Sequence, residues 1–181
     1  MNTKGTSLST RAMVYTALLT AVLCAVAPMT ISIGPIPLSL ATLVMYIAAA
    51  TLSWKNGLLS VVLYVALGAI GLPVFSNFEG GFHKIAGVTG GFIIGYIPLS
   101  IVVGIISDRF SANRLLEILG MVIGTALLYV CGLVWFMLQT GANLGSALMV
   151  CVLPFLVGDA IKITIACIIA PALRAVVAMH R

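Results

Sequence analysis

The amino-acid sequence predicts an all-α fold, an integral membrane bundle of six transmembrane helices that forms a single domain over residues 1–181. Hydrophobic residues make up 62% of the chain and charged residues only 7%, with a mean hydropathy of +1.24. Soluble domains carry about 25% charged residues. The few charges fall between long apolar stretches, and proline and glycine interrupt those stretches. No polar stretch is long enough for a separate soluble domain.

The first two helices share the uncharged stretch between Arg11 and Lys55, which is long enough for two spans of about 20 residues each. Gly34-Pro-Ile-Pro37 divides the stretch, because two prolines and a glycine cannot continue a helix. We therefore expect helices over residues 12–27 and 38–52. The polar segment before them has no signal-peptide cleavage pattern, so we expect the first helix to be retained.

Four more helices are expected over residues 56–72, 90–106, 118–138 and 146–173. Gly71-Leu-Pro73 ends the third helix. The charged segment 108–117 and the polar, glycine-containing segment 139–145 are expected to be turns. Pro154 lies either in the first turn of the last helix or at a kink within it.

The distribution of basic residues predicts the orientation in the membrane. Six helices place both termini on one side, and cytoplasmic connections carry an excess of lysine and arginine. The face that holds the termini carries Lys4, Arg11, Lys55, Arg109, Arg114, Arg174 and Arg181. The opposite face carries only Lys84. We therefore expect cytoplasmic termini in a multi-pass protein of the cell membrane, with the apolar connections at 28–37 and 74–89 capping a pocket on the outside.

The last predicted helix contains two charged residues, Asp159 and Lys162. An ionised side chain at the bilayer centre costs roughly 2.5–3.5 kcal/mol on insertion scales. The spacing of three residues places both on one helix face, within reach of each other. One interpretation is an ion pair that holds helices together. The other is the polar floor of a ligand pocket, because ionisable residues inside membranes are candidate functional residues.

Two further segments offer candidate pocket walls. Thr89, Gly90 and Gly91 begin the fourth helix, where glycines allow close approach of a ligand and free N–H groups could meet an anion. Packing of one helix against another explains the glycines equally well. In the preceding connection, Phe75 and Asn77 combine an apolar ring with an amide, as small-molecule sites do. Glu79 and Lys84 nearby are expected to be solvated.

The first predicted helix carries a stripe of small residues, Ala17, Ala21 and Ala25. Such stripes allow helices to approach closely in lipid. The spacing alone favours packing within the bundle and a partner interface equally.

Several classes of function are not supported. No basic run with interleaved aromatic residues indicates nucleic-acid binding. The four cysteines and two histidines lack ligand spacing, so no metal site is predicted. Asp159 has no second buried carboxylate beside it, and no nucleophile motif has a credible base, so we do not expect an enzyme. The chain has no Walker motif, so it cannot power transport alone.

Four motifs together resemble the BioY family of biotin-specific substrate-binding (S) components of energy-coupling-factor (ECF) transporters. They are Gly34-Pro-Ile-Pro37, Leu67-Gly-Ala-Ile-Gly-Leu-Pro-Val-Phe75, Gly87-Val-Thr-Gly-Gly-Phe-Ile-Ile-Gly95 and Gly158-Asp-Ala-Ile-Lys162. The resemblance covers nearly the whole chain and implies a bacterial or archaeal subunit that binds biotin from outside with high affinity. It implies as partners one transmembrane coupling protein and two cytoplasmic ATPases, which use the ATP, and no cofactor of its own.

The resemblance also assigns roles to the candidate residues. It places Ala17, Ala21 and Ala25 against the coupling protein and makes the connection at 28–37 a lid. On biotin, Asp159 would accept from the ureido N–H groups. Lys162 would donate to the ureido carbonyl or pair with Asp159, and Asn77 would contact the same ring. Phe75 would cover the thiophane ring, with the carboxylate near Lys84 or the Gly90 and Gly91 N–H groups.

Two other functions compete with this one. A self-sufficient secondary carrier or channel for a small vitamin-like solute would use Asp159 as a proton relay. No pair of broken helices and no second intramembrane acid supports that mechanism. A purely structural membrane subunit would bind no ligand.

Overall fold

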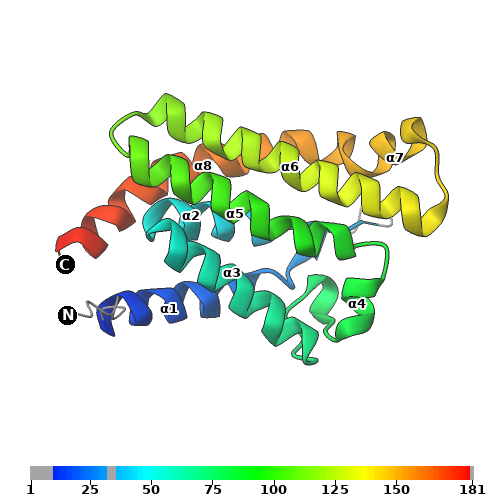
Figure 1. Cartoon of the computed structure of the whole chain (residues 1–181), viewed down its shortest axis with the longest axis horizontal. Helices are drawn as coiled ribbons and strands as arrows, with labels where there is room; N and C mark the ends of the chain where they lie inside the picture. The colour runs from blue at the N-terminus through cyan, green and yellow to red at the C-terminus, as the bar shows by residue number, and fades with distance from the viewer. Residues whose placement is uncertain (1–9, 32–35, 180–181) are drawn as a thin grey trace, which may run out of the picture.

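The computed structural model describes residues 10–31 and 36–179, and these are mostly helical (Figure 1). The helices are α1 (Thr10–Val26), α2 (Ala41–Thr51), α3 (Trp54–Ala69), α4 (Phe82–Ala86), α5 (Gly90–Phe110), α6 (Arg114–Thr140), α7 (Leu144–Cys151) and α8 (Leu153–Met179). A short 3-10 turn, η1 (Ser76–Phe78), precedes α4, and β1 (Thr30–Ile31) pairs antiparallel with β2 (Leu38–Ser39). The basic residues Lys4 and Arg181, Gly34 and Pro35 of the proline motif, and residues 32–35 of the predicted lid lie outside the described residues.

Three helical stretches of the described chain are long and apolar enough to cross a membrane. They are α5, α6 and the run Leu144–Val177, which includes α7 and α8. The helices α1, α2 and α3 are apolar but shorter. The helical, membrane-embedded class is thus confirmed, whereas the number of spans stays a prediction. The first turn of α1 and the last turn of α8 lie at the same end of the bundle (Figure 1).

The second predicted helix begins later than expected. Leu38 and Ser39, assigned to a helix from sequence, instead form β2, and α2 begins at Ala41. The Ser39 hydroxyl accepts a hydrogen bond from the Ala41 N–H at 3.0 Å and donates one to the Ala27 carbonyl at 2.8 Å. Ser39 thus links the beginning of α2 to the segment after α1, and its extended backbone pairs with Thr30 of β1.

The last predicted helix is divided in two. The backbone leaves the helical conformation at Val152 (φ −124°, ψ −58°), between α7 and α8. Pro154 lies in the first turn of α8, where its missing N–H breaks no helical hydrogen bond. Together α7 and α8 run from Leu144 to Met179, so this helical stretch is longer than the predicted segment 146–173.

Glycines bring α5 and α6 close together. A Cβ on Gly91 would lie within 3 Å of the Trp135 side chain and the Cys131 carbonyl, and one on Gly95 would meet Leu128. Bundles in lipid associate through such small residues, because backbones can then approach each other. This contact sets the position of α6, which carries Tyr129 toward the centre of the bundle.

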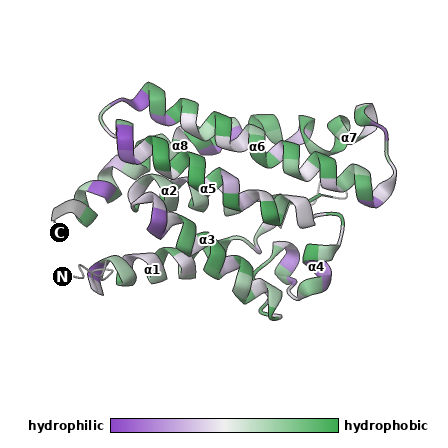
Figure 2. Ribbon diagram, viewed as in Figure 1, coloured by the Kyte–Doolittle hydropathy of each residue, from purple (hydrophilic) through white to green (hydrophobic). Residues whose placement is uncertain are grey.

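Hydrophilic residues gather at the end of the bundle where α1 begins and α8 ends (Figure 2). There the Arg174 guanidinium of α8 contacts Glu117 of α6 at 2.5 Å and donates to the Ala50 carbonyl of α2 at 2.5 Å. Glu117 is only 2% exposed and lies in the first turn of α6, so the predicted turn at 108–117 is shorter than expected. The ion pair therefore joins α2, α6 and α8 at this end.

Substitution of Gly91 tests the packing of α5 against α6. Gly91→Ala should lower the thermal stability of the purified protein, because overpacking costs roughly 1–3 kcal/mol. Gly145→Ala is the matched control, since a Cβ there meets only the Asn143 side chain at 3.6 Å. The control should gain about 0.5–1 kcal/mol from helix propensity alone. Equal melting temperatures for the two variants would contradict the close contact.

Candidate functional site

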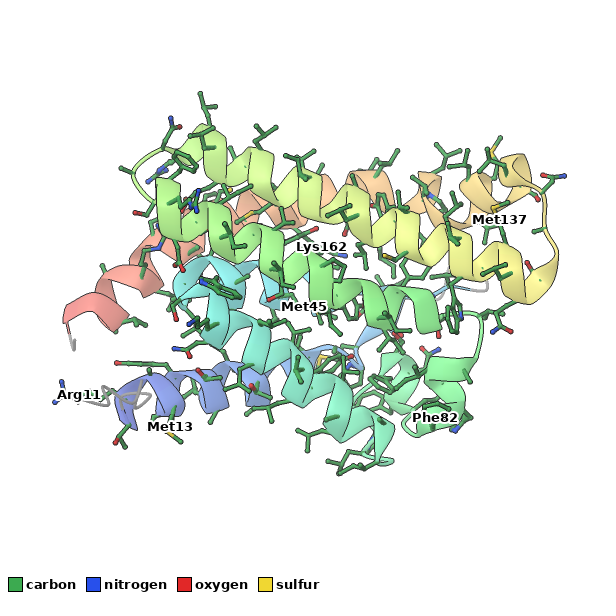
Figure 3. The ribbon with its side chains drawn as sticks, in the orientation of Figure 1. Arg11, Met13, Met45, Phe82, Met137 and Lys162 are labelled. Atoms are coloured by element: carbon green, nitrogen blue, oxygen red, sulfur yellow. The ribbon has the colours of Figure 1, made fainter. Side chains whose placement is uncertain are left out.

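The candidate site is built on the Asp159–Lys162 pair of α8, in the middle of the bundle (Figure 3). The side chains project from one helix face, as predicted, and the Lys162 Nζ lies 2.9 Å from the Asp159 Oδ1. Asp159 is 4% exposed and Lys162 6% exposed. Both charges are therefore removed from solvent, and each requires polar partners.

The beginning of α2 supplies the remaining partners of Lys162. Its ammonium donates to the Ser39 carbonyl at 2.7 Å and to the Thr42 hydroxyl at 3.0 Å. Together with Asp159 these contacts use all three N–H donors of the lysine. Because α2 begins only at Ala41 and its first N–H groups donate to the Leu40 carbonyl, the Ser39 carbonyl is free to accept from Lys162.

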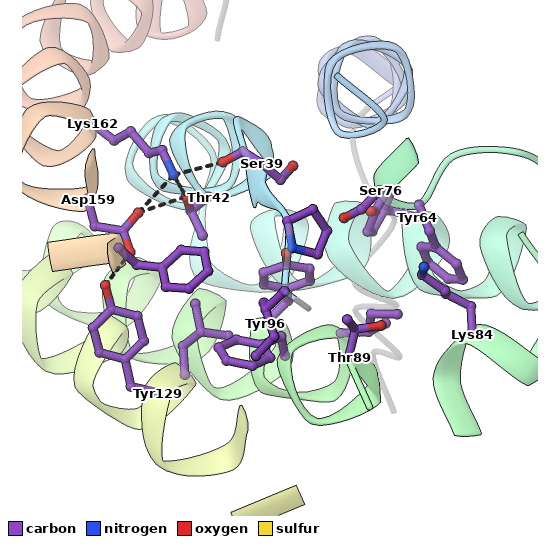
Figure 4. A pocket seen from close by; sticks show the side chains of 17 residues that line it. Ser39, Thr42, Tyr64, Ser76, Lys84, Thr89, Tyr96, Tyr129, Asp159 and Lys162 are labelled. Carbon is purple, nitrogen blue, oxygen red and sulfur yellow. Dashed lines mark hydrogen bonds and ion pairs between the residues drawn. The ribbon is translucent and has the colours of Figure 1, made fainter. Parts of the chain in front are cut away.

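Tyr129 of α6 supplies a donor to Asp159. Its hydroxyl donates to Oδ2 at 2.5 Å, and the Thr42 hydroxyl donates to Oδ1 at 3.3 Å. Figure 4 shows these contacts converging from α2, α6 and α8. In this ligand-free arrangement the carboxylate and the ammonium satisfy each other and their neighbours. An incoming ligand must therefore replace some of these hydrogen bonds.

A small cavity adjoins this polar cluster, and aromatic rings form much of its wall (Figure 4). Its volume is about 50 Å³, room for a few water molecules. Tyr64 and Phe75 pack edge to face with ring centroids 5.6 Å apart, and Phe92 and Phe155 pack with centroids 6.3 Å apart. Polar and aromatic side chains that line the cavity include Ser39, Thr42, Tyr64, Phe75, Lys84, Thr89, Phe92, Tyr96, Tyr129, Phe155, Asp159 and Lys162.

The structure brings four of the candidate ligand-binding residues together around this cavity: Phe75, Thr89, Asp159 and Lys162. Phe75 is fully buried, and Thr89 precedes the first turn of α5. An aromatic wall, a hydroxyl and an ion pair are the combination that small-molecule pockets use to bind apolar ligands in one orientation.

Asn77 does not line the cavity. Its side chain is exposed, and its Oδ1 accepts a hydrogen bond from the Thr30 hydroxyl at 2.5 Å. Its backbone N–H donates to the Pro28 carbonyl at 3.2 Å, with φ at +64°. Asn77 therefore joins the outer connection after α3 to the one after α1.

Gly90 and Gly91 do not line the cavity either. Both face neighbouring helices, where an added Cβ would meet Ile85 and Trp135 respectively. The Gly90 N–H already donates to the Gly87 carbonyl at 3.0 Å. Of the two interpretations offered by the sequence, helix packing is the one that the structure shows for these glycines.

Lys84 was expected to be solvated, and that expectation is wrong. Its side chain is 16% exposed, lines the cavity and forms an ion pair with Glu79 at 2.8 Å. The short helix α4 causes the difference, because it folds the connection back against the bundle.

Sequence reasoning missed Tyr129, Thr42 and Ser39. Thr42 lies 117 positions from Asp159, and the spacing of charges along one helix carries no information about such a partner. Tyr129 offers a weak signal, since a tyrosine within an otherwise apolar span needs a partner for its hydroxyl.

Outside the cavity, the alanine stripe lies on an open face of α1. Ala17, Ala21 and Ala25 are all exposed. The opposite face of α1 packs inward, where the Thr20 and Ser60 hydroxyls are 2.9 Å apart. The stripe is therefore not used for packing within the described part of the bundle.

Among the described residues, no three His, Cys, Asp or Glu side chains are grouped to hold a metal ion.

The energetic cost of the buried pair can be measured by removing one or both of its charges. Lys162→Met leaves Asp159 buried without its counter-charge, and breaking such pairs costs about 3–5 kcal/mol. The double variant Asp159→Asn/Lys162→Met leaves no unpaired charge and should recover much of that loss. Thermal unfolding of both variants in the same detergent gives the comparison. A double variant no more stable than Lys162→Met would argue against charge burial as the cause.

Comparison with known proteins supports a common family. The model of the BioY family matches residues 1–179. A probable biotin transporter BioY from Pyrococcus horikoshii is 36% identical over 148 residues, which cover 82% of this chain and 86% of that protein. The biotin transporter BioY of Thermotoga maritima is 33% identical over 165 residues, 91% of this chain and 96% of its own length.

A solved structure agrees with the sequence relatives. The crystal structure of the S-component for biotin from an ECF-type ABC transporter matches with a TM-score of 0.87 and 26% identity, over 94% of both chains. The family match covers nearly every residue, and the similar fold includes the helices that position the Asp159–Lys162 cluster. The chain belongs to the BioY family.

Proposed function

We propose that the chain is the biotin-binding membrane subunit, or S component, of an ECF-type ABC transporter, and not an enzyme. It captures biotin from outside and delivers it through a coupling protein and ATPases. The observation that carries the proposal is the buried Asp159–Lys162 pair beside an aromatic-walled cavity, in a chain whose fold matches a biotin S component.

The polar cluster has the donors and acceptors that the ureido ring of biotin requires. This ring offers two N–H donors and one carbonyl acceptor. Asp159 accepts from the N–H groups, in place of the Tyr129 and Thr42 hydroxyls that it contacts in the free chain. Lys162 donates to the ureido carbonyl in place of one present acceptor. The hydrogen bonds that are lost and those that are gained all involve a charged group, so the ureido ring replaces the present partners with bonds of the same charge-assisted kind.

The rest of the ligand extends along the cavity. Phe75 and Tyr64 cover the apolar thiophane ring. The carboxylate tail lies toward Thr89 and Lys84, because Lys84 lines the cavity whereas Gly90 and Gly91 face other helices. Lys84 then exchanges its contact with the exposed Glu79 for one with the ligand.

The cavity of about 50 Å³ is too small for biotin, so its walls move when the ligand enters. The segment 28–37 acts as the lid, and Asn77 holds it through the contacts with Thr30 and Pro28. We assign Asn77 to closure of the lid and leave ureido recognition to Asp159 and Lys162.

The proposed topology has six spans within one domain over residues 1–181, in the cell membrane of a bacterium or archaeon. Helices α1, α2 and α3 supply the spans that length alone does not establish. The termini are cytoplasmic. The basic residues Arg11, Lys55, Arg109, Arg114 and Arg174 lie on helices that start or finish at the hydrophilic end of the bundle (Figure 2).

Asp159→Asn tests the ligand site. The variant keeps the shape of the side chain but removes the charge that accepts from the ureido N–H groups. Biotin affinity should fall at least tenfold, about 1.4 kcal/mol, in a calorimetric titration. Asp108→Asn, which removes a carboxylate at the other end of the bundle, should bind as the unmodified protein does. An unchanged dissociation constant for Asp159→Asn would exclude the proposed role.

Energy for release comes from partner subunits. We propose that a transmembrane coupling protein contacts Ala17, Ala21 and Ala25 and that two cytoplasmic ATPases drive it. The coupling protein tilts the whole subunit, so that the outer cavity reaches the cytoplasmic side. The exposed stripe supports this assignment, because close helix contact in lipid requires small residues on an open face.

Ala21→Trp tests the partner surface. The large ring should block close approach of a helix and abolish co-purification with the ATPases, while biotin binding stays unchanged. Val134→Trp places the same ring on an exposed position of α6 and should leave assembly intact. If both variants assemble with the ATPases at wild-type yield, the alanine stripe is not part of the interface.

A further inference from the structure

A groove lies between α6 and α8, on the outside of the bundle. Its volume is about 400 Å³, larger than that of the candidate biotin cavity. The buried residues Thr125, Asp159 and Ile163 form its floor, and exposed residues form its rim. The rim residues are Ile118, Val122 and Ala126 of α6 and Leu156, Ala160 and Thr164 of α8.

Two residues line both this groove and the candidate biotin cavity, Tyr129 and Asp159. The Tyr129 hydroxyl donates to the Asp159 Oδ2 at 2.5 Å (Figure 4). The side chains of Tyr129 and Asp159 therefore separate the two spaces. Their hydrogen bond holds this partition closed in the ligand-free chain.

The rim of the groove faces the membrane. Both α6 and the helical run 144–177 are long and apolar enough to cross a bilayer, so the exposed side chains between them lie against lipid. Water is a poor occupant of a mainly apolar groove in this position, because a bound water needs two to four polar partners.

The polar side chains of the groove are already satisfied. The Thr125 hydroxyl donates to the Met121 carbonyl at 2.7 Å, and the Thr164 hydroxyl donates to the Ala160 carbonyl at 2.9 Å. With the bond from Tyr129 to Asp159, every hydroxyl proton of the lining residues has an acceptor. The groove therefore offers apolar contact to a lipid tail and no side-chain donor to a head group.

We propose that an acyl chain of a membrane phospholipid occupies this groove and that the Tyr129 ring keeps it out of the biotin cavity. The role of Tyr129 rests on the proposed function. The walls of the biotin cavity include Phe92, Leu128 and Phe155, so an acyl chain would compete with biotin there if the partition were open. In the proposed complex biotin displaces the Tyr129 hydroxyl from Asp159. The ring, more than its hydroxyl, must then maintain the partition.

Lipid retention by the purified full chain tests the groove. Phosphatidylcholine and phosphatidylglycerol with identical acyl chains are added separately, and bound lipid is counted by native mass spectrometry. Both should be retained equally, because the site holds the tail. Ala160→Trp and Ala126→Trp fill the groove from opposite walls, and each should lose most of the bound lipid. Ala172→Trp, at an exposed position of α8 outside the groove, is the matched control and should keep it.

Two outcomes would overturn the groove as an acyl-chain site. One is lipid retention in Ala160→Trp and Ala126→Trp equal to that of the unmodified chain. The other is a dimer of the unmodified chain that both substitutions abolish, because a second copy and not a lipid would then fill the groove.

Biotin titration at increasing phospholipid content tests the partition. For Tyr129→Ala the apparent dissociation constant should rise about fivefold when the phospholipid content of mixed micelles rises tenfold, as mass action predicts for a competitor. Tyr129→Phe keeps the ring, so its affinity should not depend on lipid content. Adding Ala160→Trp to Tyr129→Ala should remove the lipid dependence, because the groove is then filled.

Lipid-independent binding by Tyr129→Ala, or an equal lipid dependence in Tyr129→Phe, would contradict the partition. The lipid count involves no biotin, so its failure removes the groove and leaves the proposed function intact. Absence of biotin binding by the unmodified chain would remove the proposed function and the role of Tyr129, and would leave the groove.

Discussion

Asp159 and Lys162 are both buried away from solvent near the middle of α8. Two charges in the middle of an apolar bundle remain ionised only if each has polar partners. Those partners come from three different helices, so α2, α6 and α8 must meet at one point. The Ser39 carbonyl and the Thr42 hydroxyl at the beginning of α2 and the Tyr129 hydroxyl of α6 supply these contacts. The ion pair therefore fixes helix positions and also prepares a site for a ligand with both donors and acceptors.

The sequence identified this pair because its members are neighbours on one helix, where spacing alone determines that they can meet. It located the helices for the same reason, since apolar length and proline breaks are local properties. It could not identify Thr42 or Tyr129, which reach Asp159 only after distant segments pack together. It also could not decide between packing and ligand contact for Gly91, because both need a small residue. Only the position of Trp135 on α6 resolves that question.

The burial of Lys84 shows the same limit in the outer connections. A charged residue between glycines and phenylalanines resembles a solvated loop residue, and only the fold of α4 turns it toward the cavity. Asn77 shows the opposite difference: we expected it to contact the ligand, but its side chain links two outer connections. The regular helices were therefore easier to predict than the segments that close the cavity, whose geometry depends on contacts between loops.

Ion pairs near the middle and at one end of α8 restrict how the subunit can release a ligand. Separation of α2, α6 and α8 would expose Asp159 and Lys162 to apolar surroundings and would also break the Glu117–Arg174 pair. Exposure of the Asp159–Lys162 pair carries the cost of unpaired charges in lipid. The described parts of the outer connections are tied less strongly to each other, because the Thr30–Asn77 contact is neutral and exposed and the Lys84–Glu79 ion pair joins two residues of the same connection. Ligand entry through the outer end is thus cheaper than opening a path between the helices toward the other end. This distribution of charges supports the proposal that the subunit moves as one body during delivery, without rearrangement of its helices.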